Sequence, residues 1–271
     1  MGKSLSGSYP IERRAGEIER LRVQAEAMAP DTLVMLDRFG PMHGWKCLDI
    51  GCGPGGITDI LSDRVGSTGH VVGLDIDAEF IEYARANAQS NAEFKVDNAY
   101  GSGLPSGTFD LVHMRFVAST AGNHETLLKE VSRLARPGGI VALQEPDGST
   151  LNCYPPSPAF EKLKSVYLEA FKGVGADIEL AKQLYFLVYQ AGFRDVQYRT
   201  SLLGVRSTDP MVDYLPSTVE SIRGAILKLG LIAENDLSRA VADCRAHLAE
   251  PGASFTLFTL AQVWGGQDNQ L

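Results

Sequence analysis

A glycine-rich turn between an apolar run and a helical pattern limits most strongly how this chain can fold. Cys47 to Ile50 forms a short, mostly apolar run, and four glycines occur within the next six residues, Gly51 to Gly56. Apolar residues then recur at helical spacing over residues 57–65. Glycines let a backbone approach a ligand closely, and N–H groups at a helix N-terminus bind polar groups. The segment predicts a strand, a turn that binds a small polar ligand, and a helix.

Further strands and helices alternate along the chain after this turn. Asp77 is a candidate N-cap, and residues 123–136 show a helical pattern. Strands that alternate with helices of this length imply right-handed crossovers and a parallel sheet covered on both faces. We therefore expect a doubly wound α/β core over residues 41–147, with later strands completing it. The strands are predicted at residues 47–50, 70–76, 93–96, 109–114, 140–145, 194–200 and 254–264.

Helical segments precede the core and interrupt its last strands. Residues 1–40 are predicted as an N-terminal helical cap, in which Pro30 ends a first helix and Asp31 caps a second. The predicted core comprises residues 41–147, 190–205 and 254–266, and helical lid insertions occupy residues 148–189 and 206–253.

Composition bears on the class of partner. The chain has 25 Lys and Arg residues against 33 Asp and Glu, a net charge of −8, without a basic cluster. Nucleic-acid affinity depends on clustered positive charge, so a small-molecule partner is expected instead. No Cys and His set has metal-ligand spacing, and no apolar run is long enough to span a membrane. We expect a cytoplasmic protein without a metal site or a membrane partner, either monomer or homodimer.

An acidic residue narrows the ligand of the glycine turn. Asp75 ends the second predicted strand, 24 residues after Gly51. A carboxylate at this position accepts hydrogen bonds from both hydroxyl groups of an adenosine ribose. The pattern predicts an adenosine-containing cofactor and leaves both NAD and S-adenosylmethionine open.

Four segments together resemble the class I S-adenosylmethionine-dependent methyltransferases, and Tyr9 with residues 19–24 resembles the N-terminal helix of small-molecule methyltransferases from bacterial natural-product pathways. The first, Leu48 to Gly56, has an acidic residue, Asp49, two positions before the first glycine. The resemblance covers residues 41–147 and implies a seven-stranded sheet in the order 3-2-1-4-5-7-6, with strand 7 antiparallel. The other three segments, in family order, are residues 72–77, 104–117 and 134–139.

The resemblance also implies which residues bind S-adenosyl-L-methionine. Asp49 would orient the site from behind, Asp75 would accept from the ribose, and Ile76 would pack on adenine. Where the family usually has Asp-Ala, this chain has Asp97-Asn98-Ala99, so either of the first two is a candidate for the adenine contact. The remaining candidates are Tyr9 and Gln24 from the cap, Gly51, Cys52 and Gly53 from the turn, and Met114 from the fourth strand.

Candidates for catalysis lie where the fourth and fifth strands end. They are His113, Arg115, Glu145 and Asp147. The sulfonium methyl group is already electrophilic, so in-line positioning of the acceptor can account for much of the rate, and no base is obligatory. For the aromatic residues of the insertions, namely Phe160, Tyr167, Tyr185, Phe186, Tyr189 and Tyr214, packing is expected for most and pocket lining for one or two.

These patterns predict an enzyme that transfers a methyl group to a carbon, oxygen or nitrogen of a small organic metabolite. Methyl transfer to a protein or a tRNA is one alternative, and an NAD-dependent oxidoreductase is another, because the glycine spacing also fits a dinucleotide site. A protein that binds S-adenosylmethionine without catalysis is a third. Cofactor binding and labelled methyl transfer would separate these hypotheses.

Overall fold

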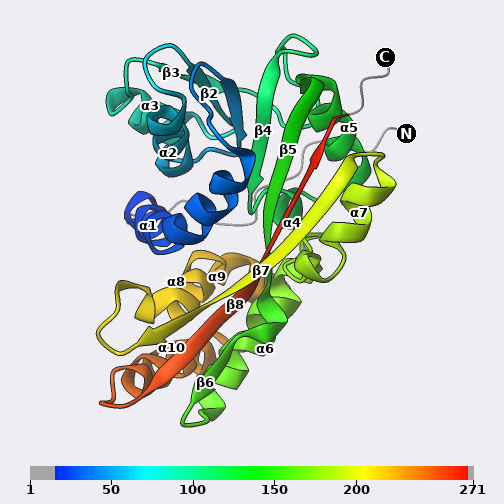
Figure 1. Cartoon of the computed structure of the whole chain (residues 1–271). Coiled ribbons are helices and arrows are strands. Elements are labelled where there is room, and N and C mark those ends of the chain that lie inside the picture. The colour runs from blue at the N-terminus through cyan, green and yellow to red at the C-terminus, as the bar shows by residue number, and fades with distance from the viewer. Residues whose placement is uncertain (1–15, 268–271) are drawn as a thin grey trace.

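The computed structural model describes residues 16–267, and its elements follow the predicted alternation of strands and helices (Figure 1). The strands are β1 (Lys46–Ile50), β2 (His70–Asp75), β3 (Ala92–Val96), β4 (Phe109–Arg115), β5 (Ala135–Asp147), β6 (Asn152–Tyr154), β7 (Arg194–Arg206) and β8 (Ser254–Gly266). The helices are α1 (Glu17–Leu36), α2 (Gly56–Val65), α3 (Ala78–Ala86), α4 (Ala118–Ala121), α5 (His124–Leu134), α6 (Pro158–Gly173), α7 (Leu184–Gln190), α8 (Tyr214–Ser221), α9 (Arg223–Lys228) and α10 (Glu234–Leu248), with short 3₁₀ turns between some of them.

The strands form one mixed sheet, and its core order matches the expectation. β3, β2, β1, β4 and β5 pair in parallel, and β8 runs antiparallel to β5 along residues 259–266. β7 pairs antiparallel with these same β8 residues, so it occupies the other edge of β8. The predicted sixth and seventh strands are therefore β7 and β8, in the predicted order.

The sheet has eight strands, so the prediction of seven was wrong. The additional strand is β6, which pairs with residues 254–256 at the start of β8. It is only three residues long and is followed by Pro155 and Pro156, a pattern that favours a loop. Its strand conformation is stabilised by a neighbour about a hundred residues away in sequence, which no local pattern reports.

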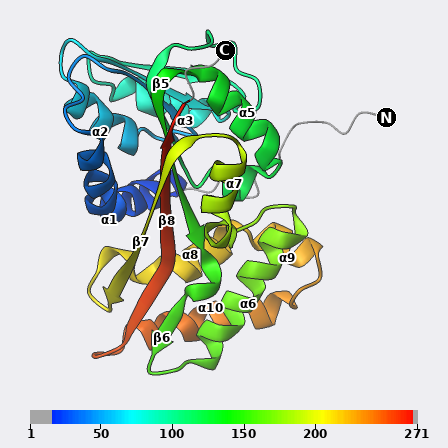
Figure 2. The same cartoon turned by 45° about the vertical axis from the view of Figure 1, so that its right-hand side comes forward.

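Two hydrophobic cores cover the faces of the first five strands. α1 and α2 pack on one face through a cluster that includes Met35 and Leu61, and α5 and α7 pack on the other through Leu127 and Val188. β7 and β8 continue beyond this region, and α6, α8, α9 and α10 gather around their far ends (Figures 1 and 2). A further cluster there includes Phe160 of α6. The division into core, cap and lid insertions remains a prediction.

The cap helix differs from the expectation. Pro30 lies inside α1, which is one continuous helix, rather than ending a first helix before a second. The buried positions Met28, Thr32 and Met35 continue one face across the proline. Packing of this face outweighs the cost of about 3 kcal/mol that an interior proline carries. Within residues 16–267, no helix combines the length and the apolar character needed to cross a membrane.

Candidate active site

The turn between β1 and α2 requires glycine at two positions for different reasons. Gly51 and Gly53 have φ angles of +68° and +52°, which L side chains rarely adopt. A Cβ on Gly51 would lie 2.2 Å from Cγ2 of Val117, so the turn packs directly against the chain that follows β4. A Cβ on Gly53 would meet nothing within 4 Å. Both residues line a cavity that Asp75 and Arg115 also line. Gly53 therefore leaves room in this cavity that a side chain would fill.

Asp75 lies at the carboxyl end of β2, beside this turn. Its Oδ2 accepts from the backbone N–H of Gly53 at 2.9 Å, and its Oδ1 accepts from that of Asp77 at 2.9 Å. Burial holds the pKa of Asp75 above its ordinary value, and the hydrogen bonds from these backbone N–H groups offset part of the increase. Asp77 caps α3 as predicted, by accepting from the N–H of Glu79. Ile76, between them, is 55% exposed and lines the cavity.

The segment after β3 brings Asp97, Asn98 and Ala99 to the same cavity. Asp97 accepts from the N–H groups of Asn98 at 2.7 Å and Gly103 at 2.9 Å, and Asn98 accepts from that of Tyr100 at 2.9 Å. Both side chains therefore hold the loop in place as well as facing the cavity. Both residues remain candidates for the predicted adenine contact.

The cap helix α1 closes one side of the cavity. Gln24 lines it together with Arg20, Leu21 and Ala25. Nη1 of Arg20 donates to Oε1 of Gln24 at 3.1 Å, so the two side chains form one polar edge. Tyr9, the other cofactor candidate from the cap, lies outside the described residues.

Among the four catalytic candidates, only Arg115 lines the cavity. Burial lowers its pKa to about 10, so the guanidinium remains charged at neutral pH. Within residues 16–267 it forms no ion pair, and Nη1 donates to Oγ1 of Thr32 at 3.5 Å. A charged guanidinium facing a cavity without a carboxylate partner favours an anionic group of a ligand.

Glu145 and Asp147 lie beside the cavity rather than in its wall. Pro146, between them on β5, lines the cavity, and successive side chains of a strand point to opposite faces. Asp147 instead accepts from the N–H and the hydroxyl of Ser149, at 3.0 and 2.6 Å. Glu145 is fully buried and accepts from the N–H groups of Ala118 and Ser119. The two acidic side chains do share one strand face, as expected from their spacing.

His113 and Asp49 belong to a buried polar network below the turn. His113 Nδ1 lies 2.8 Å from Asp49 Oδ1, and Thr58 Oγ1 donates to Asp49 Oδ2 at 2.9 Å. Gln144 Nε2 donates to His113 Nε2 at 2.8 Å, which places the ring proton on Nδ1, facing Asp49. Asp49 lines the cavity, whereas His113 does not. The contacts agree with an orienting role for Asp49, which remains a prediction.

The same network continues to the cap helix and to β8. Gln144 Nε2 also donates to Oγ1 of Thr32 on α1 at 3.1 Å, and Gln262 Nε2 donates to Gln144 Oε1 at 2.7 Å. All three residues are fully buried. None was singled out from the sequence, because a buried amide has no pattern that distinguishes it from a surface one.

Met114, on the opposite face of β4, packs in the hydrophobic core with α5 and does not line the cavity.

Glu145 is expected to make stability depend on pH. Burial raises its pKa to about 7 from an ordinary value of 4.5, against the effect of the N–H groups of Ala118 and Ser119. The folded protein therefore binds more protons than the unfolded chain in this interval, and stability falls as pH rises from about 4.5 to 7. Because one pKa unit corresponds to about 1.4 kcal/mol, the unmodified protein should lose a few kcal/mol of its free energy of unfolding across this window. The Glu145→Gln variant should not show this loss.

Urea denaturation at several pH values would measure this difference. Glu82→Gln, at an exposed position of α3, is the control. Its free energy of unfolding should change with pH as steeply as that of the unmodified protein. Identical slopes for the Glu145→Gln variant and the unmodified protein would contradict the assignment.

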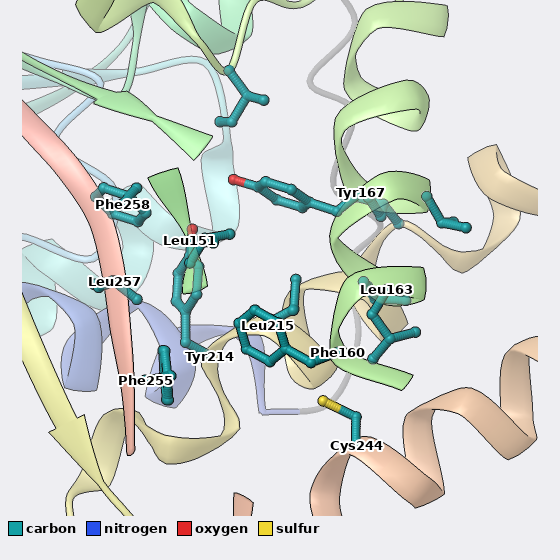
Figure 3. Packing of buried hydrophobic residues seen from close by; sticks show 14 of the residues in the cluster. Leu151, Phe160, Leu163, Tyr167, Tyr214, Leu215, Cys244, Phe255, Leu257 and Phe258 are labelled. Atoms are coloured by element: carbon teal, nitrogen blue, oxygen red, sulfur yellow. The ribbon is translucent and has the colours of Figure 1, made fainter. Parts of the chain in front are cut away.

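The far end of the cavity is built from aromatic residues of α6, α8 and β8. Tyr167 and Phe171 come from α6. Tyr214 comes from α8 and Phe258 from β8, and Figure 3 shows them with Tyr167. Of the six aromatic residues named above, Tyr167 and Tyr214 line the cavity, as expected for one or two of them, and Phe171 lines it in addition. Of the other residues named, Phe160 is core, whereas Tyr185, Phe186 and Tyr189 are exposed on α7. Phe116 and Phe258 also line the cavity and were not anticipated.

Comparisons with known proteins identify similar sequences and similar folds. A family model described as "Methyltransferase domain" matches residues 42–186. A demethylmenaquinone methyltransferase of Lactococcus lactis is 33% identical over 182 residues, which cover 60% of this chain and 71% of that protein. The YcgJ protein of Bacillus subtilis has a similar structure, with a TM-score of 0.59 at 17% identity over 89% of this chain and 99% of that one.

A second similar structure contains bound ligands. It is a phosphoethanolamine N-methyltransferase 2 of Haemonchus contortus in complex with phosphomonomethylethanolamine and S-adenosylhomocysteine. Its TM-score is 0.54 at 18% identity, over 89% of this chain and 53% of that one. At such identities, both structures establish a common fold.

Proposed function

The chain belongs to the methyltransferase domain family, and on that premise we propose that it methylates a small organic molecule with S-adenosyl-L-methionine as the methyl donor. The acceptor atom in this proposal is a carbon, an oxygen or a nitrogen. The observation that carries the proposal is the cavity in which the glycine turn, Asp75 and Arg115 meet. A cytoplasmic location, and a monomer or a homodimer, are part of the same proposal.

The residues of the cavity fit the proposed cofactor. Room beside Gly53 would accommodate a ligand passing close to the backbone, and the carboxylate of Asp75 is held in place by two N–H groups. Asp75 would accept from the ribose hydroxyls, and Ile76 would pack on the adenine. Arg115 would pair with the carboxylate of the methionine part, because its guanidinium lines the cavity and donates to a threonine hydroxyl rather than to a carboxylate. Gly51, Cys52, Gln24 and the segment 97–99 would complete the walls.

The bound cofactor would supply an electrophilic methyl group, so the protein itself needs chiefly to align the acceptor and exclude water. Three of the four catalytic candidates, His113, Glu145 and Asp147, lie outside the cavity wall. This favours a mechanism dominated by positioning, in which Arg115 orients the reactants electrostatically. The names of the Lactococcus lactis and Haemonchus contortus enzymes support a small acceptor, and neither name indicates a protein or tRNA acceptor or an oxidoreductase.

Removal of the Asp75 carboxylate tests the proposal directly. Loss of a charged acceptor for two hydroxyls should cost about 1.5 to 3 kcal/mol. Asp75→Ala is therefore expected to bind S-adenosylhomocysteine about 10- to 150-fold more weakly, as measured by isothermal titration calorimetry.

Asp243→Ala, at an exposed position of α10, is the matched control and should bind like the unmodified protein. Unchanged affinity in the Asp75 variant, or tight binding of NADH by the unmodified protein, would overturn the assignment.

A further inference from the structure

Two buried hydroxyl groups at the far end of the cavity lack hydrogen-bond partners. Among residues 16–267, five buried side-chain oxygens have none, and two of them, Tyr167 Oη and Thr218 Oγ1, belong to residues that line the cavity. A buried polar atom without a partner is destabilising, because it has lost its hydrogen bond to water without gaining another. Such atoms facing a cavity therefore point to a ligand that supplies the missing hydrogen bond.

The helices place these groups together. Tyr214 and Thr218 are four residues apart on α8, so they lie on the same helix face, and Tyr167 and Phe171 have the same spacing on α6. Figure 3 shows the side chains of Tyr167 and Tyr214 in the space between α6 and β8, with Phe258 on the β8 side of this space. Tyr167 and Thr218 both affect the pKa of Tyr214, yet neither of their hydroxyl groups makes a hydrogen bond of ordinary geometry.

The walls around these hydroxyls are aromatic. The ring centroids of Phe116 and Phe258 are 5.5 Å apart, and those of Tyr214 and Phe258 are 5.4 Å apart, both edge to face. Tyr167 and Phe171 form a further edge-to-face pair at 5.1 Å. Edge-to-face and stacked contacts of this kind are favourable for another planar ring.

The charges near the two tyrosines are balanced. The positive charge of Arg20 lowers the pKa of both phenols. Its guanidinium pairs with both carboxylate oxygens of Glu17, at 2.6 and 2.9 Å. Burial raises the pKa of Tyr167 and of Tyr214, so both remain protonated and neutral at physiological pH. The hydroxyl groups of this end are thus neutral, and the cation that acts on the two phenols is paired, which favours an uncharged group beside them.

We propose that Tyr167 and Thr218 form the acceptor subsite for a neutral, planar aromatic molecule that carries a hydroxyl or carbonyl oxygen. This inference rests on the proposed function and names its class of substrate. The aromatic walls hold the ring, and the two hydroxyls exchange hydrogen bonds with its oxygen. This hydroxyl or carbonyl oxygen thereby sets how the substrate is oriented toward the cofactor end of the same cavity.

Three probes that share one ring system test the subsite: 2-naphthol, naphthalene and 2-naphthoate. Each is titrated calorimetrically into the protein already saturated with S-adenosylhomocysteine. We expect 2-naphthol to bind about two- to twelvefold more tightly than naphthalene, which is the range for one net hydrogen bond, and 2-naphthoate to bind most weakly.

Two variants assign this preference to the named hydroxyls. Tyr167→Phe and Thr218→Val keep the shape of the side chain and remove hydroxyl groups that have no hydrogen-bond partner, so both should fold. Each should reduce the preference for 2-naphthol, and the double variant should abolish it. Tyr198→Phe, on the exposed face of β7, should leave it unchanged.

Equal affinity for 2-naphthol and naphthalene, no binding of any probe, or a preference that survives in the double variant would overturn the inference. Tighter binding of 2-naphthoate would replace the neutral substrate class with an anionic one. Failure of the unmodified protein to bind S-adenosylhomocysteine would instead overturn the proposed function. The same probes, titrated into the protein alone, would then still decide whether the subsite exists.

Discussion

Gly53→Val is expected to weaken the binding of S-adenosylhomocysteine by at least about a hundredfold, or ~2.7 kcal/mol. The added Cβ would occupy open space in the cavity beside Asp75, where the proposed cofactor passes the backbone. The φ of +52° adds backbone strain of about 1 to 3 kcal/mol, but the hydrophobic cores do not involve this residue. The variant should therefore fold and fail to bind, which calorimetry and circular dichroism would measure together.

Gly230→Val separates the two effects. Gly230 has a similar φ of +66°, its Cβ would also meet nothing within 4 Å, and it does not line the cavity. This variant should show the strain as lower stability and keep the affinity of the unmodified protein. If Gly53→Val bound as tightly as Gly230→Val does, the cofactor would have to lie elsewhere.

Gln144→Leu is expected to lower the free energy of unfolding by about 2 to 5 kcal/mol, because it leaves several buried polar groups unpaired at once. Leucine cannot replace the hydrogen bonds to His113 Nε2, Thr32 Oγ1 and Gln262 Nε2. These partners lie on β4, α1 and β8, so the loss would also loosen the cap helix from the sheet. Urea denaturation monitored by circular dichroism would measure the change.

Two comparisons control for the substitution. Gln190→Leu makes the same chemical change at an exposed position of α7 and should alter stability by less than about 0.5 kcal/mol. Thr32→Ser keeps the hydroxyl group of the network and should cost far less than Gln144→Leu. A Gln144→Leu variant as stable as Gln190→Leu would show that the network contributes little to folding.

Local patterns in the sequence predicted the order of the helices and strands and the part of the cavity formed by the glycine turn and Asp75. Glycines at positions that need positive φ, and an acidic residue at the end of the next strand, are recognisable because each depends on a few neighbouring residues. Gly51, Gly53 and Asp75 accordingly line the cavity at one edge of the sheet, as expected. The sheet order was predicted from the family resemblance, and β8 between β5 and β7 agrees with it.

The candidates at the ends of β4 and β5 could not be placed from sequence alone. Spacing showed that Glu145 and Asp147 share a face, but which face meets the cavity depends on how β5 packs against α4 and β8. Pro146, rather than either acid, lines the cavity. The structure likewise brings Arg115 into the cavity wall and buries His113 below it.

The sequence by itself determined the doubly wound architecture, the glycine turn and the acid beside it, since these follow from short-range periodicity and backbone conformation. Only the tertiary structure decided that α1 continues through Pro30, that β6 joins the sheet and that Thr32, Gln144 and Gln262 meet in one network. It also decided that Tyr167 and Tyr214, rather than the exposed aromatics of α7, line the cavity. The reason is physical: these outcomes depend on contacts between residues tens to more than two hundred positions apart, and the free energy of such contacts outweighs local preference.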